Sequence, residues 1–419
     1  MKITLPVSIR LGALVPAVLG LAAVSGCSSN HGAYTGKFKE EAVGRMNMVK
    51  AGTQWDMANQ QFQAGDIDRA LETIDTSLVL NDKVAKSHLL KGRILLEQGK
   101  LEPSLASLEK AKELDTENAD APYFMGVVLE RLERGEDALA SYRDAARLDR
   151  SNPQYTVAAA EVLMHLGRLD EAKELLEPPA GSDLPRFTQN AGVRQTLGHI
   201  ALMKRDSAAA VRYFNEACTL APLDAGLRED LARAQVAARQ FGDAEANLGR
   251  VLSDVKPGER RDLRLLRARC LLETERPVDA RILLQEMAQG PGASDPDVWV
   301  QLGNIALVLK DDHRLREAAG RVVALAPSRH EGYLLLGLYQ REIGRLSEAA
   351  ATLEKSVART ADDPTPAIVL SLVYQQIGQQ DKARSLASRA VTISPDNERA
   401  QSLARQFGAV AGVEESDAQ

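Results

Sequence analysis

The chain has 419 residues, of which 44% are hydrophobic, 4% are aromatic and 26% are charged, and its formal net charge is −6. This apolar content is sufficient for a continuous buried core. The mildly acidic, mixed charge excludes the clustered basic face that nucleic-acid binding needs. It also offers no polybasic patch for anionic lipids.

The N-terminus has the composition of a secretion signal. Lys2 and Arg10 precede an apolar segment, 11–24, that is too short for a stable membrane-spanning helix. The sequence Val24-Ser25-Gly26-Cys27 ends this segment. These features resemble a bacterial lipoprotein signal peptide with its lipobox, and the resemblance implies cleavage before Cys27 and acylation of its thiol. The alternative is an uncleaved anchor or a chance match.

The residue after the cysteine bears on the destination of such a lipoprotein. It is Ser28 and not the Asp that marks inner-membrane retention in some bacteria. The resemblance therefore implies a cell-envelope lipoprotein at the outer membrane that faces the periplasm. We expect residues 1–26 to be the signal peptide and residues 27–50 to hold the lipidated Cys27 and a tether that becomes helical near Glu40.

Residues 51–397 repeat with a period near 34 residues, in about ten units. The eighth position is small in every unit, and the twentieth position is small in nine of ten, with Leu315 the exception. A turn lies between the two positions and often contains glycine. The eighth-position residues are Ala58, Gly92, Gly126, Ala160, Gly198, Ala232, Ala268, Gly303, Gly337 and Ser371, and the turn glycines are Gly65, Gly99, Gly167, Gly344 and Gly378.

This spacing predicts two amphipathic helices per unit. Small residues at both positions allow the two backbones to approach closely, and a glycine in the turn ends the first helix with a positive φ. One unit cannot bury its apolar faces alone, so neighbouring units must stack. The expected fold is all-α.

The pattern resembles the tetratricopeptide repeat, whose hallmarks also include a small residue near position twenty-seven and a proline near thirty-two. Ala111, Ala145, Ala217 and Ala390 match the former, and Pro222, Pro327 and Pro395 match the latter. The resemblance implies a right-handed α-solenoid of about ten helix-turn-helix units. Units seven and eight depart from the pattern, because Arg267 stands where leucine is usual and Leu315 replaces alanine.

An insertion interrupts the array after the fourth unit. Because Pro178 and Pro179 should break the helix there, we expect a joint in the segment 177–190. The expected organisation is units one to four at 51–186, units five to ten at 191–397, a capping helix at 398–407 and a disordered tail at 408–419.

The sequence contains no motif typical of an enzyme. Nucleotide-binding loops, nucleophile elbows and zinc-protease or paired-cysteine motifs are absent from it. His165 and His199 fall at positions where they could approach each other, but a metal site there would lack an evident third ligand. We expect no catalytic activity, cofactor, metal or small-molecule substrate.

A protein-binding face is the better candidate. In the family the first helices line the concave face, and positions five, nine and twelve form one helical stripe. The carboxylate clamp of chaperone-binding relatives needs a lysine at position five, which no unit has. The candidate peptide-binding residues are Trp55, Asn59, Phe62, Leu89, Arg93, Tyr123, Val127, His199, Arg233, Arg269 and Asn304.

Two interpretations of this stripe remain open. The apolar residues either bind a partner or pack neighbouring first helices together, and for Arg93, Arg233 and Arg269 ion pairs within the array are favoured over ligand contacts. The leading functional hypothesis is a membrane-anchored scaffold that binds protein or peptide partners in the cell envelope, in assembly or secretion of the pilus or exopolysaccharide-export type. The alternative is a periplasmic holdase-like chaperone for unfolded clients.

Overall fold

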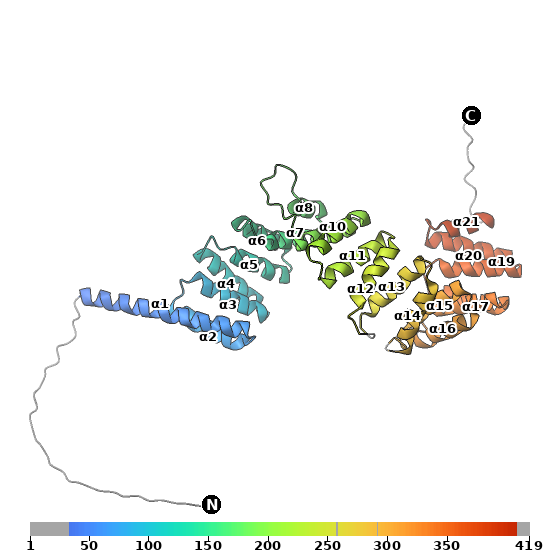
Figure 1. The fold of residues 1–419 in the computed structure, drawn as a ribbon, viewed down its shortest axis with the longest axis horizontal. Helices are drawn as coiled ribbons and strands as arrows, with labels where there is room; N and C mark the ends of the chain where they lie inside the picture. Colours follow the sequence, from blue (N-terminus) through green and yellow to red (C-terminus); the bar gives the residue numbers. More distant parts are fainter. Residues whose placement is uncertain (1–32, 257–258, 291, 409–419) are drawn as a thin grey trace, which may run out of the picture. The chain divides into compact units, whose positions relative to one another are not determined.

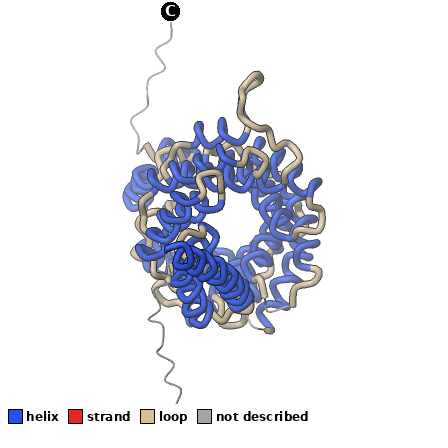
Figure 2. The backbone as a smooth tube through the Cα atoms, turned by 90° about the vertical axis from the view of Figure 1, so that its left-hand side faces the viewer, coloured by secondary structure: helices blue, strands red, loops and turns tan. Residues whose placement is uncertain are grey.

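The computed structural model describes residues 33–256, 259–290 and 292–408. Within these ranges all regular secondary structure is α-helical, in twenty-one helices (Figure 1). Figure 2 likewise shows only helices and loops for this part of the chain. The all-α prediction is confirmed. The expected signal peptide with Cys27 and the tail after residue 408 lie outside the described residues.

The chain forms two compact units, Met1–Leu132 and Glu133–Gln419. Among the described helices, none is both long and apolar enough to span a membrane. The first unit contains α1 (Ala33–Gln63), α2 (Ile67–Leu80), α3 (Ala85–Glu97), α4 (Leu101–Leu114) and α5 (Asp120–Arg131). Helix α1 begins at Ala33 and runs without a break into the first repeat, so most of the expected tether is helical.

The second unit contains the remaining sixteen described helices, which continue the same pairwise order and end in α21, within the segment for which a capping helix was predicted. They are α6 (Gly135–Leu148), α7 (Pro153–His165), α8 (Leu169–Leu176), α9 (Ala191–Met203), α10 (Ser207–Leu220), α11 (Ala225–Ala237), α12 (Phe241–Leu252), α13 (Arg261–Glu273), α14 (Pro277–Gln289), α15 (Pro296–Leu309), α16 (Asp312–Leu325), α17 (His330–Glu342), α18 (Leu346–Val357), α19 (Thr365–Ile377), α20 (Gln380–Ile393) and α21 (Glu398–Gln406).

Where both helices of a repeat lie in the same compact unit, the first helix packs against the second, and that second helix packs against the next first helix. The closest approach is at the eighth position. A Cβ atom on Gly198 would lie 2.6 Å from the ring of Phe214, and one on Gly92 would lie 2.5 Å from Leu108. Both large side chains are fully buried. The glycine therefore lets one helix receive a large side chain of the other, as ridges-into-grooves packing requires.

Two of the small residues are serines, and each adds a hydrogen bond to this contact. The hydroxyl of Ser104, at the twentieth position, donates to the carbonyl of Gly92 at 2.6 Å. In the tenth repeat the direction is reversed, because Ser371, at the eighth position, donates to the carbonyl of Ala383 at 2.8 Å. Both serines are fully buried, so these bonds remove the cost of burying a hydroxyl group.

The turn between the helices has one backbone conformation throughout the array. The fifteenth residue of every repeat has a positive φ, which confirms that all ten repeats share one register. Five of these residues are the glycines identified in the sequence, with φ between 71° and 89°. In the other five repeats the residue is Glu133, Arg205, Arg239, Glu275 or Lys310, with φ between 54° and 59°.

The insertion after the fourth repeat is a loop that forms hydrogen bonds within the second unit. Helix α8 ends at Leu176, before the two prolines, and α9 begins at Ala191. Tyr213 donates a hydrogen bond to Glu177 at 2.7 Å, and Arg186 donates to the carbonyl of Pro178 at 2.7 Å. The boundary between the two compact units lies after Leu132, not in this loop.

We expect Gly198→Ala to lower the free energy of unfolding by about 1–3 kcal/mol, because the new methyl group would overlap the buried ring of Phe214. The matched control is Gly320→Ala, in the interior of α16, where a Cβ would meet nothing within 4 Å. This control should gain up to about 1 kcal/mol from helix propensity. Thermal unfolding followed by circular dichroism compares the two, and equal midpoints would contradict the packing account.

Candidate partner-binding surface

The sequence-predicted stripe of the first unit lies on three adjacent first helices. Helices α1, α3 and α5 contact one another in order. All seven predicted residues of this unit are partly buried, so none is fully hidden in the core. Trp55, Asn59 and Phe62 lie on α1, Leu89 and Arg93 on α3, and Tyr123 and Val127 on α5.

Trp55 joins the first two repeats. Its indole N–H donates a hydrogen bond to the carbonyl of Lys86 at 3.1 Å. The ammonium group of Lys86 also lies 4.1 Å from the centroid of the indole ring, at cation–π distance. The indole therefore already has a hydrogen-bond acceptor and a cation on one face, which supports a packing role for Trp55 alongside any role in binding.

Arg93 joins all three helices. Its guanidinium carbon lies 5.3 Å from the ring centroid of Phe62 on α1 and 4.8 Å from that of Phe124 on α5. Such contacts contribute roughly 0.5–2 kcal/mol each. Within the described residues Arg93 makes no ion pair, so the salt bridge expected for it is wrong. Its N–H groups, unlike its faces, remain available to an acceptor on a partner.

Two residues of this surface were missed by the sequence analysis. Phe124 follows Tyr123, whose ring it meets edge to face with centroids 5.2 Å apart. Lys86 is the second residue of its repeat. Position two lies three residues before position five, on the same face of the helix, and this spacing is the signal that could have identified Lys86. Phe124, at position six, carries no such signal.

The remaining predicted residues of this unit differ in environment. Leu89 and Val127 pack against a buried cluster that contains Leu96 and Leu108. Phe124 packs against the same cluster, so all three side chains contribute to the core while remaining partly exposed. Asn59 lies on α1, four residues after Trp55 and three before Phe62, on the same face of the helix.

In the second unit the same helical positions carry polar groups that pair with one another. His199 on α9 lies with Nε2 3.3 Å from a carboxylate oxygen of Asp230 on α11, and its ring meets Phe214 edge to face. Gln195 donates a hydrogen bond to the same oxygen of Asp230 at 2.8 Å. Burial raises the pKa of Asp230, but the hydrogen bonds from His199 and Gln195 together lower it more, so it lies below its usual value.

Arg233 confirms the expected ion pairing within the array. Its guanidinium lies 2.9 Å from Glu229 and 2.8 Å from Asp262 on α13. Arg260 contacts the same two carboxylates at 2.7 and 3.1 Å. The four side chains form a closed cluster in which two positive and two negative charges balance.

The last two predicted residues, Arg269 on α13 and Asn304 on α15, are exposed. Arg269 makes no ion pair within the described residues, contrary to expectation. His165 is also exposed, and among the described residues no group of three metal-ligating side chains exists.

The two units thus present different chemistry on their first helices. The first unit offers half-buried aromatic rings around an unpaired guanidinium, a combination of apolar area and hydrogen-bond donors that suits a peptide segment. On α9, α11 and α13 the second unit offers the paired charges of His199, Asp230 and Arg233, and the exposed Arg269 is the exception. The first unit is the better candidate for a binding surface.

The hydrogen bonds to Asp230 predict a pH-dependent contribution to stability. Because folding lowers the pKa of Asp230, the contribution is present above the unfolded pKa of about 3.9 and is lost as the pH falls through the folded value. At pH 7 we expect Asp230→Asn to cost about 1 kcal/mol. The urea midpoints of Asp230→Asn should approach those of the wild type as the pH falls from 7 to 3. The control Asp183→Asn, at an exposed residue of the loop after α8, should match the wild type at every pH. A constant difference would contradict the assignment.

The family model described as tetratricopeptide repeat matches residues 56–119, 125–177, 229–296 and 304–364, together more than half of the chain. No curated protein matches the sequence.

Solved structures with a similar fold include pilF of Pseudomonas aeruginosa, at 22% identity and TM-score 0.41 over 50% of this chain and 94% of that one. PilW, described as a type IV pilus biogenesis factor, has 15% identity and TM-score 0.43 over 51% of this chain and 96% of its own. A tetratricopeptide repeat protein from Parabacteroides merdae has 18% identity and TM-score 0.42 over 62% of this chain and 99% of its own.

All three TM-scores lie below 0.5, so the assignment rests on the family match and on the common register of the ten repeats. The chain belongs to the tetratricopeptide repeat family.

Proposed function

We propose that this protein is a lipid-anchored scaffold of the bacterial cell envelope that binds a dedicated protein partner through the first helices of its N-terminal unit. Tetratricopeptide repeats bind protein or peptide partners, and the chain is a repeat array over most of its length. The observation that carries the proposal is the stack of Phe62, Arg93 and Phe124, which holds an unpaired guanidinium between half-buried rings on three adjacent helices.

The envelope location is proposed on the sequence Val24-Ser25-Gly26-Cys27 and on Ser28 after it. A lipid on Cys27 would hold the array at the outer membrane, on its periplasmic face. There the array would help to assemble or secrete an envelope machine of the pilus or exopolysaccharide-export type. It would act by binding and not by catalysis.

One observation separates a scaffold from a holdase-like chaperone. A holdase needs a long, open apolar surface for unrelated clients, but Leu89 and Val127 are engaged in the core and Trp55 is bonded to Lys86. What remains open is a small site with directed donors on Arg93. This arrangement favours one partner, or a few, over many.

The test is a photo-crosslinkable residue at position 123 in living cells, in place of Tyr123 on α5. We expect one dominant envelope protein to be captured, and Trp55→Ala with Arg93→Ala should reduce the adduct at least tenfold, since interface anchors of this kind contribute about 1.4 kcal/mol or more. Arg69→Ala on α2, whose side chain is 74% exposed, is the matched control and should leave the adduct unchanged.

A second crosslinker at position 223, where Leu223 is 96% exposed, reports the background of random encounters. A broad set of outer-membrane and secreted chains at position 123 would support the chaperone instead. A signal no higher than that at position 223 would contradict binding at this surface.

The lipid anchor is tested separately. Growth with an alkyne fatty acid should label the wild-type protein, and Cys27→Ser should abolish the label and release the protein from the membrane fraction. A Ser28→Ala control should keep both. Retention of Cys27→Ser in the membrane without label would show that the N-terminus acts as an uncleaved anchor.

A further inference from the structure

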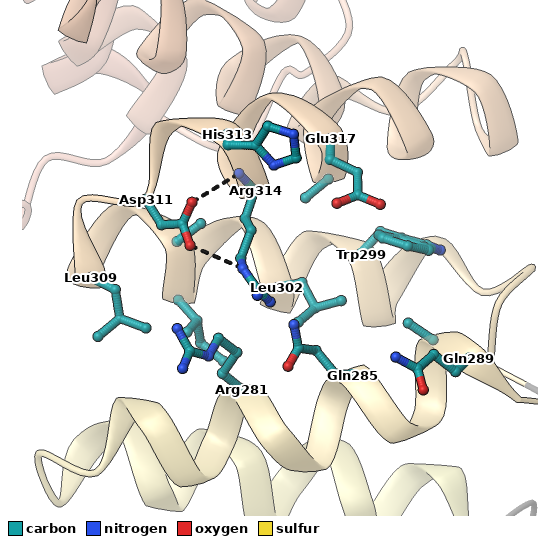
Figure 3. Close-up of a pocket in the computed structure, with 14 residues that line it drawn as sticks. Arg281, Gln285, Gln289, Trp299, Leu302, Leu309, Asp311, His313, Arg314 and Glu317 are labelled. Carbon is teal, nitrogen blue, oxygen red and sulfur yellow. Dashed lines mark hydrogen bonds and ion pairs between the residues drawn. The ribbon is translucent and has the colours of Figure 1, made fainter.

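A pocket of about 280 Å³ lies in the second unit between α14, α15 and α16 (Figure 3). It involves neither the stack on Arg93 nor any residue of the predicted stripe. In Figure 3, Arg281 and Gln285 extend from α14, Trp299 and Leu302 come from α15, and Arg314 reaches in from the start of α16. The pocket is thus lined by two second helices and the first helix between them.

The pocket coincides with the repeat that departs most from the common pattern. The twenty-fourth residue is large in eight of ten repeats, as in Leu108 and Phe214, but it is Ala319 here. A Cβ on Gly303 would accordingly lie 2.6 Å from Leu335 of the next repeat, and no residue of α16 is among its nearest neighbours. Helix α16 instead begins with charged residues and directs Arg314 and Glu317 to the pocket.

Arg281 lines this pocket and has one side-chain nitrogen that makes no hydrogen bond. Its Nε atom is buried and has no hydrogen-bond partner. Within the described residues its guanidinium makes no ion pair. Gln285 and Gln289 follow it at intervals of four on the same face of α14 and line the same pocket.

The other charges of the pocket are largely accounted for. Arg314 lies with Nε 3.0 Å from Asp311, and the backbone N–H of Arg314 donates to the same carboxylate at 3.1 Å. The carboxylate of Asp311 therefore already has partners in the first turn of α16. Glu317 is exposed and adds one negative charge to the lining, which repels a dianion such as phosphate more strongly than a single carboxylate. An apolar wall is provided by Trp299, Leu302 and Leu309.

We propose that this pocket binds the side chain of a glutamate or aspartate in a protein partner. The carboxylate accepts hydrogen bonds from the terminal N–H groups of Arg281, whose side chain lines the pocket, and the amide groups of Gln285 and Gln289 supply further donors. The aliphatic part lies against Trp299 and Leu302. The volume lies at the lower end of the range of small-molecule sites, about 300–1,000 Å³, and has room for one partner side chain.

The proposal rests on the proposed partner binding, to which it adds a second contact with defined chemistry. It is distinct from a carboxylate clamp on the first helices, because its cation comes from the second helix α14. A partner that reaches it would carry an acidic residue next to apolar ones.

Trp299 supplies the readout. The chain has two tryptophans, so Trp55→Phe leaves Trp299 as the only one. The full chain in this background is titrated with N-acetyl-Leu-Glu-Leu-amide and with the neutral N-acetyl-Leu-Gln-Leu-amide, and tryptophan fluorescence is recorded. We expect a saturable change with the glutamate peptide and at least tenfold weaker binding of the glutamine peptide, as for loss of a charged hydrogen bond.

Arg281→Met should abolish the response to the glutamate peptide. Arg316→Met, an exposed arginine of α16 that does not line the pocket, should retain it. Circular dichroism melting shows that both variants are folded, and an isothermal titration repeats the comparison without fluorescence. Equal binding of the two peptides, no binding of either, or binding that survives Arg281→Met would overturn the proposal.

Inorganic phosphate is the last probe. If it produces the same saturable change at lower concentration than the glutamate peptide, the pocket is an inorganic anion site and the carboxylate assignment is wrong. These titrations use no natural partner. Their failure therefore leaves the crosslinking result at position 123 standing, and a failure of that result leaves these titrations interpretable.

Discussion

The contact on which the array depends is the close approach of the two helices within each repeat. At Gly92, Gly198 and Gly337 the approach is so close that a Cβ atom would overlap a buried side chain of the partner helix. Because neither helix can rotate without losing this fit, the face that each first helix presents is fixed. The side chains at positions five, nine and twelve then share one surface as a consequence of packing, before any functional requirement acts on them.

Neighbouring first helices contact each other through different side chains in the two units. In the first unit the connection consists of aromatic rings and cations, with Arg93 between Phe62 and Phe124. In the second unit it consists of ion pairs, with Arg233 shared between Glu229 and Asp262. A partner that binds the ion cluster must first break its ion pairs, so little binding free energy is gained there. The guanidinium of Arg93 contacts rings with its faces, and its N–H groups can still donate to an acceptor on a partner. This difference is the reason for placing the partner on the first unit.

Most of the fold could be predicted from the sequence, because the small eighth and twentieth positions recur in one register. The turns could be predicted only where glycine marks them; Glu133 and Arg205 adopt the same positive φ because the packed helices on both sides impose it. The site could be predicted as a stripe but not as a set of contacts. Whether Arg93 meets a carboxylate or a ring depends on side chains from two other repeats, and an unpaired atom such as Nε of Arg281 becomes evident only when all neighbours are in place.

The central claim is that a partner binds the first helices of the N-terminal unit. Hydrogen–deuterium exchange of the full chain, alone and with the purified partner, tests it most directly because backbone amides along the whole chain report independently. We predict slower exchange in α1, α3 and α5 on binding, with α2 and α4 unchanged. Protection confined to α2 and α4, or to the second unit with none in α1, α3 and α5, would contradict the account.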